Sequence, residues 1–482
     1  MGSAEPDDTG RLHAAFRWLP IAILVVVLVG ATGALLRSEA PPRGDAVAND
    51  DANDAPDIPV LSVRRSLDPL LGRAADAGLV ADLDAFVETL PPETCLAVRA
   101  GSVDYEYRAD DPQIPASIQK LVVAVAALIE LGGDATYVTD VHGALGGDGV
   151  VQGDLFLQGG GDPILSTAPY AARSRNQPQI FSDFDRLADA VVAAGVTAVT
   201  GAVVGDEHRY DNVRYNPIWP GRHIVDNLTG PLSALSVNDG LAYFPDAGGV
   251  FGASAEPAQY AAQVLTDALR ARGVRIDADP AVGATPPDLA RIAAHESPPM
   301  AQIVAQMLQD SDNTTAELLL KEVGLASAGA GTFDAGQVSI ESILADAGLA
   351  VDDATIVDGS GLATQDQVTC TFVVDLLEYS PTADTIRAGL AVAGESGTLS
   401  RRWADTDLQG RIHAKTGTLD HVTALAGRAE TRDGSDARFS LIINLPEDEF
   451  VTAELVAEQQ VLAEILTAHP DVPEVDHLRP VP

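Results

Sequence analysis

Apolar and polar residues follow one another in patterns that predict a mixed helix and strand protein from about Val63 onward. Two alternating runs, 95–99 and 103–107, flank Gly101-Ser102 and predict a β-hairpin, because alternation is the period of a half-buried strand. Further strands are expected at 411–416, 421–431 and 437–445. Apolar positions near helical spacing predict helices at 67–89, 121–131, 181–194, 257–272, 299–308, 314–323, 333–347, 365–379 and 452–469.

The order of these elements predicts the fold class. A hairpin, a helical block, further strands and a closing helix indicate an α+β fold in which helices pack on an antiparallel sheet. The stretch from about Tyr137 to Ala293 differs, because short strands punctuated by glycine dominate it. We interpret residues 139–291 as an inserted accessory domain, which leaves 63–138 and 292–482 as one discontinuous domain.

The N-terminal region contains a long apolar segment. Residues 18–36 are nineteen uncharged, mostly apolar residues between Arg17 and Arg37, about enough to span a bilayer as a helix. The segment is either a membrane anchor or the apolar part of a cleaved signal peptide. Both alternatives leave 1–17 as a cytoplasmic N-terminus, place the folded part outside the cytoplasm and make 37–62 a flexible linker.

Composition excludes several classes of function. The formal net charge is −40, from 70 acidic and 30 basic residues, so a nucleic acid would be repelled. Histidines are scattered and no Cys-x-x-Cys occurs, so we expect no metal site, and no motif points to a cofactor. Cys95 and Cys370 could pair outside the cytoplasm, but their separation along the chain leaves this open.

Lysine is rare in this chain, which makes each lysine informative. Only Lys120, Lys321 and Lys415 occur among the 30 basic residues. An ammonium group can lose its proton when it is buried or lies beside another cation, whereas a guanidinium group effectively cannot. Two of the three lysines fall within short motifs, and we interpret the third, Lys321, as structural.

Three short motifs follow one another along the chain: Ser117-x-x-Lys120, Ser311-Asp312-Asn313 and Lys415-Thr416-Gly417. A serine hydroxyl is a poor nucleophile unless a base removes its proton during attack. Residues at i and i+3 of a helix share one face, so Lys120 can lie beside Ser117 and act as that base if it is neutral. Burial, or a charge supplied by Lys415, would favour the neutral form.

The remaining motif residues suit substrate binding and proton transfer. The backbone amides of Ser117 and Thr418 would form an oxyanion hole. Lys415, Thr416 and Thr418 are suited to a terminal carboxylate, and Gly417 would leave room for substrate along its strand. We expect Ser311 and Asn313 to relay a proton to the leaving amine and to bind the substrate amide.

These motifs, in this order, are those of active-site serine penicillin-recognising enzymes. Ser117 and Ser311 lie 194 positions apart, which resembles the low-molecular-mass class C penicillin-binding proteins, the D-alanyl-D-alanine carboxypeptidase/endopeptidase family of the peptidase S13 type. Accessory segments agree, including 159–163, 231–238, 297–299, 358–362 and 393–399. The resemblance implies a transpeptidase-like domain with a five-stranded antiparallel sheet and helices on both faces.

The resemblance also implies an activity. Ser117 would be acylated by the penultimate D-Ala of a peptidoglycan stem peptide ending in D-Ala-D-Ala, water would then release the acyl group, and β-lactams would trap the same serine. Cleavage of cross-linked peptides, an endopeptidase activity, stays open. One rival is a β-lactamase, but no Glu-x-x-Leu-Asn-like segment lies between the second and third motifs. The other is a catalytically silent, membrane-tethered scaffold, which the retained lysines disfavour.

Overall fold

The computed structural model describes residues 68–174, 179–244 and 248–471. The segments expected to form the cytoplasmic N-terminus (1–17), the membrane anchor or signal (18–36) and the linker (37–62) lie outside the described residues. Within the described ranges, no helix combines the length and the apolar character needed to cross a bilayer.

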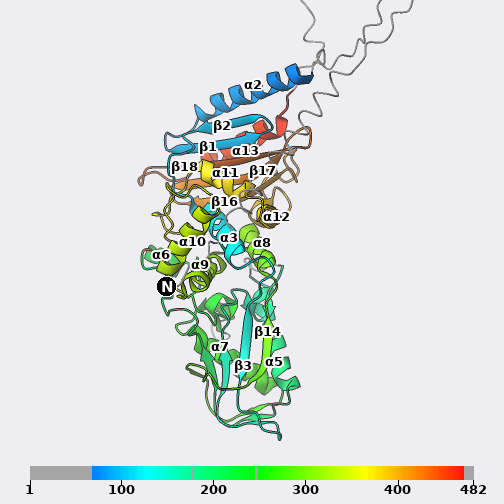
Figure 1. Cartoon of the computed structure of the whole chain (residues 1–482), viewed down its shortest axis with the longest axis vertical. Helices are drawn as coiled ribbons and strands as arrows, with labels where there is room; N and C mark the ends of the chain where they lie inside the picture. Colours follow the sequence, from blue (N-terminus) through cyan, green and yellow to red (C-terminus); the bar gives the residue numbers. More distant parts are fainter. Residues whose placement is uncertain (1–67, 175–178, 245–247, 472–482) are drawn as a thin grey trace, which may run out of the picture. The chain divides into compact units, whose positions relative to one another are not determined.

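An antiparallel sheet of six strands, in the order β15-β16-β17-β18-β1-β2, carries the predicted hairpin at one edge (Figure 1). We expected five strands in this sheet, one fewer than the structure has. The additional strand, β15, has only two residues, too few to leave an alternating pattern in the sequence. The strands are β1 (Thr94–Ala100), β2 (Val103–Tyr107), β15 (Ala391–Val392), β16 (Ile412–Leu419), β17 (Val422–Glu430) and β18 (Asp436–Asn444).

Helices cover both faces of this sheet, as predicted. Alternate residues of β1 point to opposite faces, the period of a strand. Leu96 and Val98 pack in a core with helices α2 (Asp68–Val87) and α13 (Ala453–Ala468). The intervening residues, Cys95 and Ala97, pack in a second core with the larger block of helices.

The larger helical block lies between the sheet and the inserted region in Figure 1. Its core is almost entirely aliphatic and buried. Helix α12 was not predicted, because seven residues are too few to show helical periodicity. The block comprises α3 (Gln119–Glu130), α8 (Met300–Asp310), α9 (Asn313–Ala328), α10 (Phe333–Asp346), α11 (Cys370–Glu378) and α12 (Ala383–Gly389), with the short 3₁₀ segments η2 (Ala116–Ile118) and η5 (Gly397–Leu399).

Cys95 and Cys370 form a disulfide, with their Cα atoms 5.9 Å apart. The bond joins β1 to the first residue of α11, and both residues are fully buried. The sequence had left this pairing open. The disulfide therefore fixes one helix of the larger block onto the sheet, across 275 positions of sequence.

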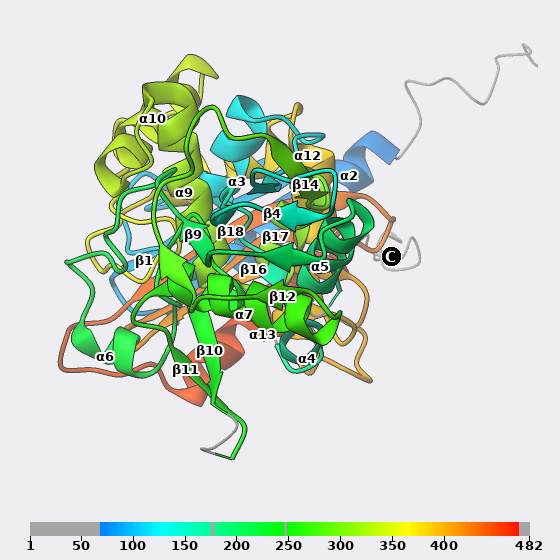
Figure 2. The same ribbon diagram turned by 90° about the horizontal axis from the view of Figure 1, so that it is seen from below.

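The inserted region has sheets and a core of its own (Figures 1 and 2). Its largest sheet has the order β13-β9-β5-β3-β14, and a smaller parallel sheet has the order β12-β8-β4. The strands are β3 (Val138–His142), β4 (Val150–Val151), β5 (Leu155–Gln158), β6 (Leu165–Ser166), β7 (Ser182–Asp183), β8 (Ala198–Val199), β9 (Val203–Asp206), β10 (Leu241–Phe244), β11 (Val250–Ala253), β12 (Arg275–Ile276), β13 (Ala281–Val282) and β14 (Arg291–Glu296).

Two longer helices of this region, α5 (Phe184–Ala193) and α7 (Pro257–Ala271), pack their apolar faces into that core. Shorter elements are α4 (Ala168–Ala171), α6 (Gly221–Val225) and the 3₁₀ segment η3 (Asn238–Gly240). Among the described strands, those of the inserted region pair only with one another. The region contributes to the site described below through the connection between β9 and β10.

Candidate active site

Ser117 lies in the 3₁₀ turn η2, which leads directly into helix α3. The preceding residue, Ala116, has φ 46°, a left-handed conformation that residues with a side chain rarely adopt. Gly361 packs against this turn, and a Cβ atom on it would lie 1.8 Å from the Ala116 carbonyl oxygen. The strained conformation is therefore held by close packing, which keeps the half-buried Ser117 at the start of the helix.

Lys120 lies one helical turn after Ser117 and is fully buried. Its Nζ atom is 3.0 Å from Ser117 Oγ, 2.6 Å from Asn313 Oδ1 and 2.7 Å from the Ser360 carbonyl oxygen. Burial lowers the pKa of Lys120 to about 8, although the buried carboxylates of Asp358 and Glu317 oppose the shift. The lysine predicted to be the base is thus both close to the serine and easier to deprotonate than a free lysine.

Ser311 and Asn313 flank the end of α8 and the start of α9. Ser311 ends α8 in the left-handed conformation, with φ 62°, and Asp312 caps α9 by accepting the Thr315 amide. The Asn313 side chain accepts from Lys120 through Oδ1 and donates through Nδ2 to the Leu228 carbonyl oxygen at 2.7 Å. The middle motif therefore contacts both lysine-bearing motifs, because Ser311 faces Lys415.

Lys415 lies on β16 and is fully buried. Its Nζ atom donates to Ser311 Oγ and to the Thr416 carbonyl oxygen, each at 2.8 Å. Burial and the neighbouring Lys120 lower its pKa well below the ordinary value. Of the two causes that the sequence left open for a neutral Lys120, burial or a charge from Lys415, burial is the main one.

The residues after Lys415 present the edge of β16 to the site. Strand β15 pairs only with His413 and Ala414, so among the described strands the edge beyond them has no partner on that side. Thr418 is exposed, and the Thr416 hydroxyl lies 3.0 Å from that of Thr398. This edge offers backbone and hydroxyl groups to an extended ligand.

Gly417 lies where β16 approaches the turn that carries Ser117. A Cβ atom on Gly417 would lie 2.8 Å from the Pro115 carbonyl oxygen and 3.3 Å from Ala116 Cβ. The glycine therefore allows β16 to approach the nucleophile turn closely. The expectation that Gly417 leaves room for substrate along its strand stays a prediction beside this packing role.

Several residues at the site were not identified from the sequence. The turn 358–362 is one of the accessory segments of the resemblance, and its Ser360 carbonyl contacts Lys120 directly. Glu317 and Asp358 hold this turn through backbone amides. A buried carboxylate on a helix has the same sequence signature as a solvated one, so no pattern could have revealed them.

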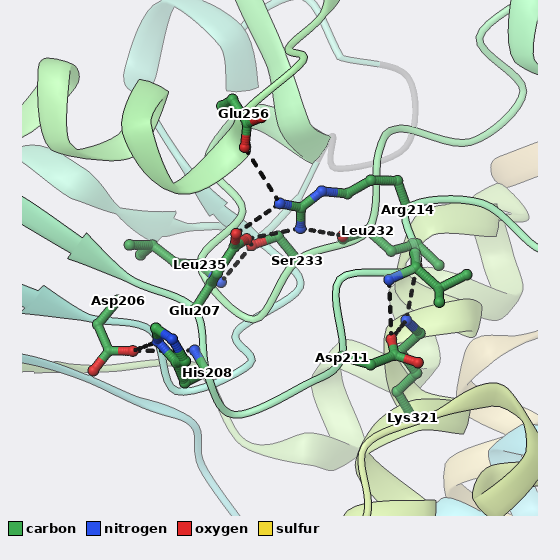
Figure 3. Close-up of polar contacts among 11 residues, drawn as sticks. Asp206, Glu207, His208, Asp211, Arg214, Leu232, Ser233, Leu235, Glu256 and Lys321 are labelled. Carbon is green, nitrogen blue, oxygen red and sulfur yellow. Dashed lines mark hydrogen bonds and ion pairs between the residues drawn. The ribbon is translucent and has the colours of Figure 1, made fainter. Parts of the chain in front are cut away.

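The connection between β9 and β10 links the inserted region to α9 (Figure 3). Lys321 Nζ donates to Asp211 Oδ1 at 2.5 Å and to the Val213 carbonyl oxygen at 2.9 Å, and lies 4.7 Å from the centre of the Phe333 ring. In the same segment, Arg214 forms two hydrogen bonds with the Glu207 carboxylate. Lys321 thus contacts the inserted segment.

The part of the chain that the structure describes contains no cluster of three or more His, Cys, Asp or Glu side chains placed to hold a metal ion. The groups gathered around Ser117 are amines, hydroxyls and amide oxygens, which suit proton transfer and anion binding. A helix-covered antiparallel sheet with these groups beside the partly unpaired side of β16 fits the class of the active-site serine penicillin-recognising enzymes, whose three motifs the chain carries.

Comparison with known proteins agrees with this class. The model of the D-Ala-D-Ala carboxypeptidase 3 (S13) family matches residues 94–247 and 245–465. The chain is 30% identical over 515 residues to a D-alanyl-D-alanine carboxypeptidase of Actinomadura sp. (strain R39), covering 90% of this chain and 87% of that protein. It is also 30% identical over 363 residues to carboxypeptidase DacB of Mycolicibacterium smegmatis, covering 71% of this chain and 74% of that protein.

The fold has a solved counterpart in penicillin binding protein 4 (dacB) from Haemophilus influenzae. The two structures agree with a TM-score of 0.67 at 22% identity, over 80% of this chain and 99% of that one. The protein therefore belongs to the D-Ala-D-Ala carboxypeptidase 3 (S13) family. It is a serine-type hydrolase of the carboxypeptidase class, and this membership favours that function over the two rivals, a β-lactamase and a silent scaffold.

Proposed function

We propose that this protein removes the terminal D-Ala from peptidoglycan stem peptides ending in D-Ala-D-Ala, through an acyl-enzyme formed on Ser117. The observation that carries the proposal is the 3.0 Å distance from Lys120 Nζ to Ser117 Oγ in a buried site. A base at this distance can take the hydroxyl proton as the oxygen attacks a carbonyl carbon.

The partners of Lys120 orient its lone pair toward the serine. A neutral amine has two N–H groups and one lone pair. The Ser360 carbonyl oxygen can only accept a hydrogen bond, and so can Asn313 Oδ1, whose assignment is fixed because Asn313 Nδ2 donates to the Leu228 carbonyl oxygen. These two acceptors occupy both N–H groups, so the lone pair remains for the Ser117 proton.

The other motif residues complete the reaction. The backbone amides of Ser117 and Thr418 stabilise the negative charge on the carbonyl oxygen of the tetrahedral intermediate. As that intermediate collapses, the bond to the terminal D-Ala breaks and Ser311 delivers a proton to the leaving amine. Lys415 donates to Ser311 at 2.8 Å and can replenish that proton. The proton that Lys120 took from Ser117 passes to Lys415, so both amines regain their starting charge. Water then attacks the ester carbon and gives its proton to Lys120, and the ester bond breaks as that proton returns to Ser117 Oγ.

Recognition of the substrate falls to the edge of β16. Its unpaired edge can hold an extended peptide, with the terminal carboxylate at Lys415, Thr416 and Thr418. Asn313 already donates within the protein through Nδ2, so its contribution to the substrate amide requires an exchange of partners. A β-lactam carries a carboxylate beside its reactive carbonyl and would acylate the same serine.

The place of action and the division of the chain follow from the same proposal. Peptidoglycan lies outside the cytoplasm, so the folded part works there, with residues 18–36 as its membrane anchor or cleaved signal. The self-contained pairing of strands between Val138 and Glu296 supports an accessory domain of residues 139–291 within a transpeptidase-like domain of 63–138 and 292–482.

Labelling with a fluorescent penicillin tests the proposal. We expect the wild-type protein to form a covalent adduct on Ser117 and to release D-Ala from a D-Ala-D-Ala pentapeptide, and we expect Ser117→Ala to do neither. The matched control is Ser102→Ala, since Ser102 is exposed in the turn between β1 and β2 and should leave both signals unchanged. A wild-type protein without any adduct would contradict the proposal.

Endopeptidase activity requires the site to admit a larger leaving group. Incubation with a cross-linked stem-peptide dimer, alongside the pentapeptide, separates the two reactions by the amine released. We expect the pentapeptide to be the better substrate, and faster cleavage of the dimer would assign the protein primarily as an endopeptidase.

A further inference from the structure

Glu317 is a fully buried carboxylate that holds the turn opposite Lys120. It lies four residues after Asn313 on α9, so the two side chains share one face of the helix. Glu317 Oε1 accepts the Ser360 amide at 2.7 Å and the Gly359 amide at 3.1 Å. The carbonyl of Ser360 is the group that accepts from Lys120 at 2.7 Å. Helix α9 therefore reaches Lys120 twice, directly through Asn313 and indirectly through Glu317.

The turn that Glu317 holds packs closely against its neighbours. A Cβ atom on Gly359 would lie 2.5 Å from the Ala316 carbonyl oxygen, and Gly361 packs against the nucleophile turn. On the other side, Asp358 accepts the Gly361 and Ala363 amides at 2.6 and 2.7 Å. The turn thus lies between α9 and the residue that precedes Ser117, with carboxylates binding its amides.

We propose that Glu317 is a positioning residue for acylation: by binding the Gly359 and Ser360 amides, it aims the Ser360 carbonyl at Lys120 and so turns the Lys120 lone pair toward Ser117. The proposal rests on the function proposed above, in which Lys120 is the base. It goes beyond that function because Glu317 belongs to none of the three motifs and touches no reacting atom.

Charge gives Glu317 a second effect on the same lysine. Burial, and next the neighbouring Asp358, raise the pKa of Glu317 to about 8. When ionised, Glu317 stabilises the ammonium form of Lys120 and so raises the pKa of Lys120. Several other titratable groups face Glu317 or influence the charge of Lys120. They are Lys120 itself from α3, Asp312 and Lys321 from α9, and Asp358 and Asp366 from the turn region.

Removing the Glu317 carboxylate therefore has two separable consequences. The Ser360 carbonyl loses its support, so the limiting rate of acylation should fall by at least about tenfold, since a misplacement of roughly 1 Å can cost about a hundredfold in rate. The ammonium form of Lys120 also loses a stabilising charge, so the midpoint of the pH–rate profile should move to lower pH. A residue with a merely structural role would leave that midpoint unchanged.

The experiment measures the acylation rate of the full chain by fluorescent penicillin from pH 6 to pH 10. Glu317→Ala removes both the acceptor and the charge and should show both changes, whereas Glu317→Gln keeps an acceptor oxygen for the two amides and should show mainly the movement of the midpoint. Glu317→Asp keeps the charge but shortens the side chain, so it should lower the limiting rate with a smaller movement of the midpoint. The matched control is Glu322→Gln, since Glu322 is a buried carboxylate of the same helix that binds Arg209 and Tyr210 and not the turn. This control should keep the wild-type midpoint.

The outcomes separate this proposal from the proposed function. A wild-type chain that forms no Ser117 adduct would overturn the function itself. A wild-type adduct together with an unchanged limiting rate and midpoint in Glu317→Ala would overturn only the positioning role. Thermal melting of each variant shows whether it is folded, and if Glu317→Ala does not fold, a Glu317→Asp variant with the wild-type limiting rate would overturn the role instead.

Discussion

The two lysines of the active site are both fully buried, but their surroundings differ. The carboxylates of Asp358, Glu317, Asp312 and Asp366 act on Lys120 and favour its charged form. Asp310 favours the charged form of Lys415, but burial and the neighbouring Lys120 lower the pKa of Lys415 well below its ordinary value. Burial thus lowers the pKa of both amines, and the placement of carboxylates decides which of the two keeps a proton.

In the function proposed above, this difference would give the arriving substrate a part in catalysis. Two nearby ammonium groups disfavour each other's charge, so their protonation is coupled. A substrate carboxylate bound at Lys415 supplies the negative charge that this lysine lacks. The shared proton is then favoured on Lys415, which leaves Lys120 neutral and able to accept the Ser117 proton.

Lys120→Arg should have the largest effect. A guanidinium group cannot become neutral at any working pH, so the general base is lost. We expect the rate of acylation by fluorescent penicillin to fall by about a thousandfold, the contribution typical of a positioned base. A loss of less than tenfold, with normal thermal stability, would show that another group takes the proton.

Removing the substrate carboxylate should have the second largest effect. A pentapeptide with a C-terminal amide cannot supply negative charge to Lys415. Hydrogen bonds to charged groups contribute about 1.5–3 kcal/mol, so kcat/KM for release of the terminal residue should fall by roughly 10- to 150-fold. Equal rates for the acid and amide peptides would contradict the comparison between the two lysines.

The pH dependence should follow Lys120. Its pKa is about 8, and only the neutral amine can accept a proton, so acylation should be slow below this value and should rise as pH increases through it. For one group with this pKa, the rate should increase by about tenfold between pH 7 and pH 9. A profile that is flat across this range would show that Lys120 is not the titrating base.

Lys321→Arg should have the smallest effect. Lys321 contacts the inserted segment through Asp211 and the Val213 carbonyl oxygen, and an arginine retains the charge needed there. We expect acylation within about threefold of wild type and a lower melting temperature, because a larger side chain must fit a fully buried position. A loss comparable to that of Lys120→Arg would give the third lysine a direct part in the chemistry.

Much of the fold was predictable from local pattern. The alternation at 95–107 gave the hairpin of β1 and β2, and the long helices ended within a few residues of the expected positions. The errors were short elements, such as the two-residue β15 and the seven-residue α12, which tertiary contacts create and periodicity cannot reveal.

The candidate site divides in the same way. The motifs identified Ser117, Lys120 and Lys415 as candidate site residues, because their chemistry requires particular residues at fixed spacing. Sequence could not show that Asn313 binds Lys120, since they are 193 positions apart and meet only through packing of α3 on α9. Glu317 was not identified for a related reason, because the sequence does not show whether a glutamate in a helix is buried.

The burial of all three lysines has a practical consequence for handling the protein. The chain has no other lysine, and each of these is fully shielded from solvent in the folded state. Reagents that modify primary amines, including active esters used to attach dyes or to couple proteins to surfaces, should find only the N-terminal amine. Coupling through the abundant carboxylates would suit this molecule better, and amine modification would instead report its unfolding.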